Sequence, residues 1–279
     1  MVVFPNAKIN IGLYVTSTLP NGYHTIETIM LPIGWSDILE IVPARGEQTT
    51  LTVTGRKVDC PLEKNLVFRA WQLMHDRFGI GAVDMYLHKI IPDGAGLGGG
   101  SADAAFTLMV LNDLFEIGLG KGALAELASS LGADCPFFIY NKPMLAEGIG
   151  ERLTEVKMPE FGGYIVVVKP QRSVSTAQAY GHVEIASPPQ KLSDMISSPV
   201  SLWKSTGIRN GFEQSVVTLL PEVEEIKRKL IDAGAIYTSM SGSGSAVYGL
   251  FTDDKKSQQA VRKFTDMSVY FSPLLFGTR

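Results

Sequence analysis

The chain has 279 residues, a formal net charge of −3 and 45% hydrophobic residues, which fits an ordinary globular protein with one large or two medium domains. The nearly balanced charge argues against a protein that holds nucleic acid by bulk positive charge. No apolar run approaches the ~20 residues that a membrane-spanning helix needs. Two cysteines, Cys60 and Cys135, exclude a disulfide framework and a four-cysteine zinc site. Together with an N-terminus unlike a signal peptide, they predict a cytoplasmic protein.

The first part of the chain is rich in strand patterns. Four segments within the first 55 residues alternate apolar and polar residues or are rich in Val, Ile and Thr between turns, a pattern typical of strands. These strands are expected at residues 7–18, 25–34, 38–44 and 49–55. Apolar residues at helical spacing then predict a helix over residues 65–79, with Asn65 as its N-cap. Residues 83–91 predict another strand.

The rest of the chain mixes helices and strands without strict alternation. Helices are expected at residues 101–115, about 120–131, 134–140, 221–234 and 258–267, and strands at 163–169, 235–240 and 246–251. Residues 186–201, rich in Ser and Pro, predict a loop. The fold class is therefore α+β. An α-rich run gives way to a strand pattern near residue 146, which predicts two domains, 1–146 and 147–279.

The strongest local signal is a glycine-rich segment between a strand and a helix. Five of the seven residues from Gly94 to Gly100 are glycine, and a helix is expected to begin at Ser101. Glycine lets a backbone approach a ligand closely, and a helix N-terminus offers unpaired N–H groups and partial positive charge. Together these features favour a phosphate site. A turn that only reverses the chain is the alternative, but it needs one or two glycines rather than five.

Two common phosphate loops do not fit this segment. The spacing Gly94-x-Gly96-x-x-Gly99 matches the dinucleotide fingerprint, but no acidic residue closes a second strand about 20 residues later. A Walker loop needs a lysine after the glycines, whereas Ser101 follows Gly100 directly. The segment therefore matches neither of these two loops, and a different class of protein is expected.

That class is indicated by three motifs in order along the chain. PDGAGLGGGSADAA (residues 92–105) resembles the central motif of the GHMP kinases, which bind ATP on a loop of this kind. AKINIGL (residues 7–13) and SGSGSAVYGLF (residues 241–251) resemble the N-terminal and C-terminal motifs of that family. Residues 21–26 (NGYHTI) and 131–139 (LGADCPFFI) are similar to the branch of the family whose alcohol substrate carries a cytidine diphosphate.

The resemblance implies an ATP- and Mg²⁺-dependent kinase with two small-molecule substrates and no nucleic-acid or membrane partner. It implies phosphorylation of the 2-hydroxyl group of a cytidine diphosphate-linked methylerythritol in the non-mevalonate isoprenoid pathway. The implied fold joins an N-terminal domain like the second domain of ribosomal protein S5 to a ferredoxin-like C-terminal domain. A kinase for another alcohol, such as homoserine or mevalonate, and a non-catalytic nucleotide-binding protein on the same scaffold are the alternatives.

Two residues are expected to carry the chemistry. Asp134 stands two residues before Pro136, and on sequence alone it is either a helix N-cap or a general base for a substrate hydroxyl. The resemblance implies the base. It also implies that Lys8 pairs with Asp134 and stabilises the attacking oxygen, although a lone lysine in an apolar strand commonly extends to the strand edge instead.

The resemblance places the nucleotide on a run of residues around the glycine loop. These are Lys89, Pro92, Asp93, Gly94, Ala95, Gly96, Leu97, Gly98, Gly99, Gly100, Ser101 and Ala102. For Lys89, an exposed strand lysine is the alternative. Ser101 is also the candidate Mg²⁺ ligand. Asp103 in the same turn would repel a bare triphosphate, which predicts a metal ion between them.

The remaining implied contacts are to the alcohol substrate. Asn10 is expected near the reacting hydroxyl group, and Tyr23 is expected to stack on the cytosine, with Tyr180 as the second ring and His24 at the base edge. Stacking of this kind is worth ~1–3 kcal/mol per base in single-stranded nucleic-acid binding. The set is completed by Thr176, Gly242 and Ser243. A half-buried aromatic residue at 23 and a plain hairpin at 242–243 are the alternatives.

Overall fold

The computed structural model describes residues 1–58, 60–181 and 183–277. Its strands are β1 (Val2–Val3), β2 (Asn6–Thr18), β3 (His24–Ser36), β4 (Ile38–Pro43), β5 (Thr50–Gly55), β6 (Val83–Lys89), β7 (Met144–Glu147), β8 (Arg152–Glu155), β9 (Phe161–Lys169), β10 (Tyr237–Met240), β11 (Val247–Phe251) and β12 (Ser268–Phe276). Its α-helices are α1 (Leu66–Phe78), α2 (Gly99–Leu114), α3 (Lys121–Ser129), α4 (Cys135–Tyr140), α5 (Thr176–Tyr180), α6 (Leu192–Ile196), α7 (Glu213–Leu219), α8 (Glu222–Asp232) and α9 (Asp254–Val261). Two short 3₁₀ helices are η1 (Leu62–Lys64) and η2 (Val200–Leu202).

The chain forms two compact units, and each is assembled from separate stretches of sequence. Unit 1 consists of Met1–Lys8, Gly34–Asp93 and Gly98–Lys142, and unit 2 consists of Ile9–Ile33, Gly94–Leu97 and Pro143–Arg279. The fold is thus α+β in both units, as the sequence predicts. The single domain boundary at residue 146 stays a prediction. The compact units do not follow one such boundary, because unit 2 also includes residues 9–33 and 94–97.

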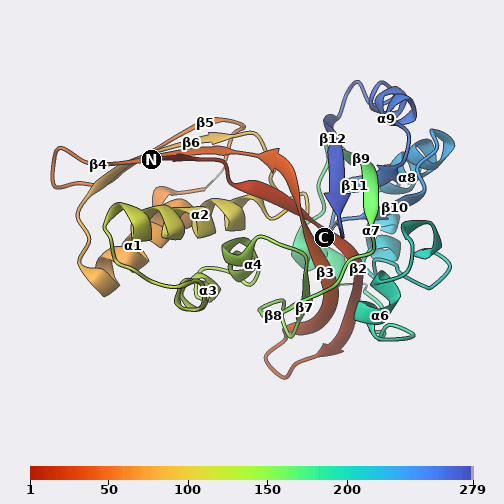
Figure 1. The fold of residues 1–279 in the computed structure, drawn as a ribbon, viewed down its shortest axis with the longest axis horizontal. Coiled ribbons are helices and arrows are strands. Elements are labelled where there is room, and N and C mark those ends of the chain that lie inside the picture. The colour runs from red at the N-terminus through yellow and green to blue at the C-terminus, as the bar shows by residue number, and fades with distance from the viewer. Residues whose placement is uncertain (59, 182, 278–279) are drawn as a thin grey trace. The chain divides into compact units, whose positions relative to one another are not determined.

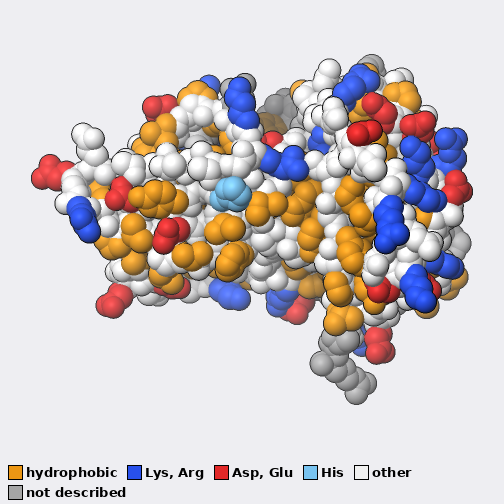
Figure 2. All heavy atoms as spheres, turned by 90° about the horizontal axis from the view of Figure 1, so that it is seen from above, with side chains coloured by type: hydrophobic (Ala, Val, Ile, Leu, Met, Phe, Trp, Pro, Cys, Tyr) orange, Lys and Arg blue, Asp and Glu red, His pale blue; other side chains and the backbone are white. Residues whose placement is uncertain are grey.

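Unit 1 is a four-stranded sheet with helices on one face. The strand order is β1-β4-β6-β5, antiparallel except for the parallel pair β5–β6, and α1 to α4 lie on one side of it (Figure 1). Helix α1 begins and ends as predicted: the Asn65 side chain accepts a hydrogen bond from the Val67 N–H, and Gly79 is left-handed at the C-terminus. On the face that the helices leave open, hydrophobic side chains stand among polar ones (Figure 2), as is common for antiparallel sheets.

Unit 2 contains two four-stranded sheets. Residues of β2 and β3 pair with β7 and β8 in the order β2-β3-β7-β8, and the other sheet has the antiparallel order β10-β11-β9-β12. Alternate residues of β9 and β11, such as Val166, Val168 and Val247, enter a core that also includes Leu13 from β2 and Leu230 from α8. The strand–loop–strand prediction for residues 235–251 is confirmed by the antiparallel pair β10–β11.

Three sequence-based predictions need correction. Residues 186–201 are not only a loop: they contain α6, whose Leu192, Met195 and Ile196 are buried, so a short apolar pattern outweighed the flanking Ser and Pro. The last helix is α9 (Asp254–Val261) rather than 258–267, because Asp253 accepts a hydrogen bond from the Lys256 N–H and starts it earlier. Helix α2 begins at Gly99 instead of Ser101.

Within the described part of the chain, none of the helices combines the length and apolar character needed to cross a membrane.

Candidate active site

Lys8 and Asp134 form an ion pair in unit 1. Lys8 lies in β2, and its Nζ is 3.3 Å from Asp134 Oδ2. The lysine side chain is 4% exposed, whereas the aspartate side chain is 32% exposed. Asp134 is at the N-cap position of α4, but its side chain makes no capping hydrogen bond. The carboxylate is therefore held by a buried cation while one side of it remains open to solvent.

A glycine makes room for this lysine. Gly98 has a left-handed backbone, with φ of +72°, which L side chains rarely adopt. A Cβ atom at this position would lie 2.9 Å from Phe138 Cζ and 3.2 Å from Lys8 Cε. Close packing against the lysine stem and a left-handed turn thus both require glycine at the point where the loop enters α2.

Ser101 and Cys135 lie beside each other next to this pair. The Ser101 hydroxyl group interacts with the Cys135 thiol, and burial raises the pKa of Cys135 to about 12. A thiol with this pKa is protonated at neutral pH and is a poor nucleophile. Cys135 is therefore a packing residue despite standing next to Asp134, and the half-buried Ser101 stays in the first turn of α2.

Lys89 lies in a second buried ionic cluster of unit 1. Its Nζ is 2.7 Å from Asp103 Oδ2 and also donates to Asp37 Oδ2. The side chains of Lys89, Asp37 and Asp103 are 2%, 0% and 3% exposed. The exposed strand lysine that was the alternative for Lys89 is thus wrong. Asp103 does not face outward either, because its carboxylate is committed to this cluster.

One cation shared by two buried carboxylates leaves an excess of negative charge. Burial raises the pKa of Asp103 from 3.8 to about 7, against the lowering effect of the Lys89 ammonium group. Burial opposes the charge on Lys89 as well, but the carboxylates of Asp103 and Asp37 outweigh it and raise the pKa of Lys89. The described residues offer Asp103 Oδ1 no hydrogen-bond partner.

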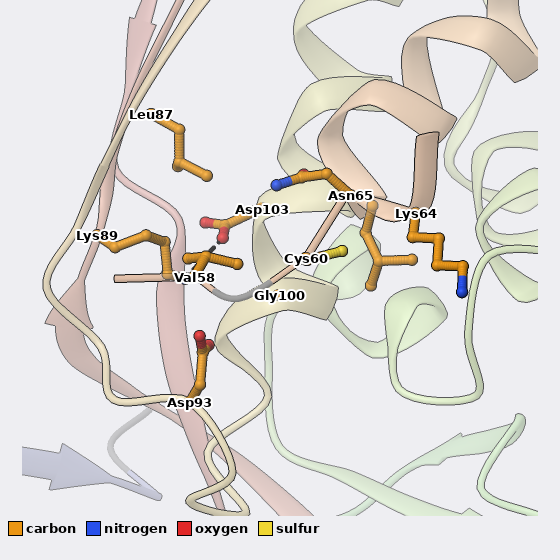
Figure 3. Close-up of a pocket in the computed structure, with 10 residues that line it drawn as sticks. Val58, Cys60, Lys64, Asn65, Leu87, Lys89, Asp93, Gly100 and Asp103 are labelled. Atoms are coloured by element: carbon orange, nitrogen blue, oxygen red, sulfur yellow. Dashed lines mark hydrogen bonds and ion pairs between the residues drawn. The ribbon is translucent and has the colours of Figure 1, made fainter. Parts of the chain in front are cut away.

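A pocket in unit 1 opens beside this cluster. It is lined by the following residues: Val58, Cys60, Lys64, Asn65, Leu66, Leu87, Lys89, Asp93, Gly100 and Asp103. Figure 3 shows the side chains of Leu87, Asn65 and Asp103 around the same space, with Asp93 from the glycine loop and Gly100 from the first turn of α2. The pocket combines apolar walls with a few polar groups, as small-molecule sites commonly do.

Sequence reasoning missed most of this pocket. Val58 and Asn65 come from the segment before α1, and Leu66 is the first residue of that helix. The segment has no glycine-rich motif that would mark it as a ligand site. Asn65 was identified only as a helix cap. A signal was present in the short, poorly patterned stretch between β5 and α1, because irregular segments at the edge of a sheet commonly line binding sites.

The tip of the glycine loop, residues 94–97, belongs to unit 2 and is bound there by the C-terminal glycine motif. The Ser241 hydroxyl group donates to the Gly96 carbonyl at 2.8 Å, and the Ala246 N–H donates to the Ala95 carbonyl at 3.1 Å. Gly242 packs closely against Gly96: a Cβ atom at position 242 would lie 3.1 Å from the Cα atom of Gly96. The structure thus brings together two motifs that are about 145 residues apart.

Asn10 lies in the same part of unit 2 and is 2% exposed. Its side-chain amide donates to Thr28 Oγ1 at 3.1 Å, its backbone N–H donates to Ser241 Oγ, and its carbonyl accepts from the Tyr248 hydroxyl group at 3.0 Å. The residue is therefore rigidly held by three elements. Such support is what a side chain needs to orient a ligand group.

In unit 2 the ring of Tyr180 lies against His24, and the enclosure of a cytosine by Tyr23 and Tyr180 stays a prediction. His24, not Tyr23, stacks on Tyr180, with ring centroids 4.6 Å apart and an interplanar angle of 26°. Tyr180 also makes an edge contact with Phe212 at 4.8 Å. Tyr23 is 61% exposed, so the half-buried aromatic residue that was its alternative is wrong. The Thr176 hydroxyl group is 3.2 Å from that of Ser243, which places two other predicted contact residues side by side.

The residues of the structure fit a nucleotide-borne metal ion better than a protein metal cage. Among residues 1–58, 60–181 and 183–277 there is no group of three or more His, Cys, Asp or Glu that could hold a metal ion. Asp103 is already paired with the Lys89 cation. The Ser101 hydroxyl group, in the first turn of α2, is an oxygen that could contact a Mg²⁺ ion bound mainly through phosphate oxygens.

Comparisons with known proteins agree over almost the whole chain. A family model described as GHMP kinases N terminal domain matches residues 65–142, and one described as GHMP kinases C terminal matches residues 201–268. A Parabacteroides distasonis protein named 4-diphosphocytidyl-2-C-methyl-D-erythritol kinase is 48% identical over 251 residues, 90% of this chain and 92% of the relative. A Bacteroides fragilis protein of the same name is 46% identical, covering 92% and 94%. A crystal structure of 4-(cytidine 5'-diphospho)-2C-methyl-D-erythritol kinase matches with a TM-score of 0.82 and 31% identity over 100% of both chains.

Proposed function

Because the chain belongs to the GHMP kinase family, we propose that it transfers the γ-phosphoryl group of ATP to the 2-hydroxyl group of 4-diphosphocytidyl-2-C-methyl-D-erythritol, a step in isoprenoid precursor synthesis. The similarity to relatives of that name, at more than 40% identity over nine tenths of the chain, is the observation that carries the proposal. We expect the protein to work in the cytoplasm as a small-molecule kinase.

Asp134 is the general base in this reaction. Its partly exposed carboxylate accepts the proton of the substrate hydroxyl group as that oxygen attacks the γ-phosphorus, and the bond to the β–γ bridging oxygen breaks to release ADP. Lys8, 3.3 Å away, provides positive charge where the hydroxyl oxygen becomes anionic. The missing capping bond of Asp134 supports this role, because a carboxylate engaged with α4 backbone would be a weaker proton acceptor.

ATP is bound by the glycine loop and the pocket beside it. The triphosphate lies against Pro92, Asp93 and residues 98–102 of unit 1, where the N-terminus of the 16-residue helix α2 offers backbone N–H groups. The base fills the apolar pocket between Leu66 and Leu87, which Asp93 of the loop and Gly100 of α2 also line. Ser101 is the residue that would hold Mg²⁺, which neutralises charge on the phosphates when bound.

The cytosine is recognised by residues of unit 2. The His24–Tyr180 stack supplies an aromatic platform, and base stacking of this kind is worth ~1–3 kcal/mol. Tyr23 is exposed and next in sequence, so it is available to cover the base from the other side. Asn10, Thr176, Gly242 and Ser243 bind the methylerythritol diphosphate part of the substrate.

The first test is an ADP-release assay with Mg-ATP and four alcohols: 4-diphosphocytidyl-2-C-methyl-D-erythritol, mevalonate, homoserine and galactose. Turnover with the cytidylyl alcohol alone, giving a phosphomonoester at the 2-position by ³¹P NMR, is the expected result. Turnover with another alcohol would keep the kinase chemistry and contradict the cytidine site. ATP binding without turnover on any alcohol would favour a nucleotide-binding protein.

A pair of variants tests the cytidine site separately. Tyr180→Leu removes the ring that stacks on His24 and should raise KM for the cytidylyl alcohol by roughly 5- to 100-fold with little change in KM for ATP, as expected for a lost stacking contact. Phe68→Leu, which changes an aromatic residue of α1 in unit 1, is the control. Equal KM values for the alcohol in both variants would contradict the assignment.

A further inference from the structure

Asp37 lies outside every motif singled out in the sequence, yet it holds the strand end that leads into the glycine loop. Its side chain is 0% exposed. Its Oδ1 accepts hydrogen bonds from the backbone N–H groups of Ile90 and Ile91, the second at 2.8 Å, and its Oδ2 accepts from Lys89 Nζ. One carboxylate therefore binds three consecutive residues directly ahead of Pro92.

The other end of the loop is tied to the same cluster within unit 1. Lys89 Nζ also donates to Asp103 Oδ2 at 2.7 Å, and Asp103 lies near the start of α2. The helix begins so close to the strand end that a Cβ at Gly99 would lie 3.0 Å from Ile91 Cγ2 and 3.3 Å from Lys89 Nζ. The residues before and after the loop are thus fixed relative to each other.

We propose that Asp37 is a positioning residue of the kinase: by holding residues 89–91 against the first turns of α2, it sets the shape of the loop that binds the triphosphate, without touching the nucleotide. The contacts of Asp37 do not depend on the proposed function, whereas the binding of triphosphate by the loop rests on it. A loop with five glycines has much conformational freedom to lose. Fixing both of its ends before ATP arrives lowers the cost of binding.

A purely structural role for Asp37 would be to balance the buried charge of Lys89. The two roles need different chemistry: balancing needs the negative charge, whereas positioning needs an oxygen that accepts from Ile90 and Ile91. Asp37→Asn keeps that oxygen but loses the charge and the acceptor for Lys89 Nζ, and Asp37→Leu loses the oxygen as well. The two variants therefore separate the roles, because Lys89 keeps Asp103 as a partner in each.

The test measures ATP affinity by calorimetry, KM for ATP and for the alcohol, kcat, and hydrogen exchange of the backbone amides of residues 90–98. We expect Asp37→Asn to keep ATP affinity within about threefold, and Asp37→Leu to weaken it by roughly 10- to 100-fold, as a misplaced binding element does. In the Leu variant the amides should exchange faster while KM for the alcohol stays unchanged. Equal losses of ATP affinity in both variants, or native affinity in the Leu variant, would overturn the proposal.

Two controls keep this comparison decisive. Asp84→Asn changes an aspartate of β6, the strand that carries Lys89, and this aspartate accepts from Thr50 instead; the variant should leave ATP affinity unchanged. If Asp37→Leu does not fold, Asp37→Ser, which is too short to reach both amides, replaces it. A wild-type protein that binds ATP but does not phosphorylate the cytidylyl alcohol contradicts the proposed function alone, since the Asp37 comparison is read from ATP binding and exchange. A wild-type protein that binds no ATP overturns both.

Discussion

Lys8 and Lys89 occupy similar places in unit 1. Each is a buried lysine on a strand that is otherwise largely apolar, and each is paired with aspartate. Their partners differ: the Asp134 side chain is 32% exposed, whereas those of Asp37 and Asp103 are 0% and 3% exposed. An open carboxylate can meet a substrate, while an enclosed one can only hold protein groups. The exposure of the acid, not the burial of the lysine, thus separates a pair suited to proton transfer from one suited to positioning.

The largest expected effect comes from changing the open pair, Lys8 and Asp134, whose carboxylate is exposed to solvent. Asp134→Asn should lower kcat by ~10²–10⁴-fold, which is the usual contribution of a general base, and should leave ATP affinity within about threefold. Steady-state kinetics and calorimetry measure the two quantities. Lys8→Met should also lose most turnover. A kcat near the wild-type value in either variant would show that the residue does not act on the reacting hydroxyl group.

The next largest expected effect is a difference in the free energy of unfolding between variants of Lys89 and Lys8. Lys89→Met leaves two buried carboxylates without their cation and should lower the free energy of unfolding by ~3–5 kcal/mol. Lys8→Met leaves Asp134 in contact with water, so its cost should stay below ~1 kcal/mol. Urea unfolding of both variants measures the difference. Equal costs would mean that the two clusters do not differ in the way their exposure indicates.

Gly98→Ala sharpens the comparison by acting on the lysine of the open pair. The new Cβ would lie 2.9 Å from Phe138 Cζ and 3.2 Å from Lys8 Cε, at a residue with φ of +72°. The left-handed backbone alone should cost ~1–3 kcal/mol of stability, and displacement of the Lys8 stem should lower kcat. Gly120→Ala, at a glycine with negative φ and open space around it, is the control. A stable Gly98→Ala protein with native kcat would contradict this account.

The most gradual effect, small per pH unit, is a pH dependence of stability that belongs to the buried cluster of Lys89, Asp37 and Asp103. The folded chain holds an extra proton on Asp103 between its unfolded pKa of 3.8 and its folded pKa of about 7. Stability therefore falls as the pH rises through this window, by at most ~1.4 kcal/mol per pH unit. Asp103→Asn should remove that slope. Urea unfolding of both proteins across the window measures it, and parallel stability curves would contradict the raised pKa.

Sequence patterns predicted the features that depend on local chemistry. The cap at Asn65, the left-handed end at Gly79 and the helix after the glycine loop all follow from short-range rules. The pairing of Lys8 with Asp134, 126 positions apart, follows only from resemblance to a family. Neither residue differs in its immediate neighbours from an ordinary strand lysine or helix cap.

What the sequence did not indicate depends on long-range packing. Asp37 stands between Ser36 and the strand β4 like any turn residue, and its burial arises only when β6 brings the N–H groups of Ile90 and Ile91 to it. The choice of His24 rather than Tyr23 as the partner of Tyr180 depends on which way each side chain of a strand end points. Neighbouring residues of a strand point to opposite faces of the sheet, so a difference of one position places a side chain on the other face.

The interleaving of the two units has a consequence for synthesis on the ribosome. Every residue of unit 1 lies before position 143, but residues 9–33 belong to unit 2, whose main part begins at Pro143. At ~5–20 residues per second, the remaining chain takes on the order of ten seconds to emerge. During that time Leu13 and Val15 lack the core that they form with later residues such as Val166 and Leu230 in the finished fold. A nascent chain stalled after Lys142 is therefore a client for chaperones rather than a free-standing domain.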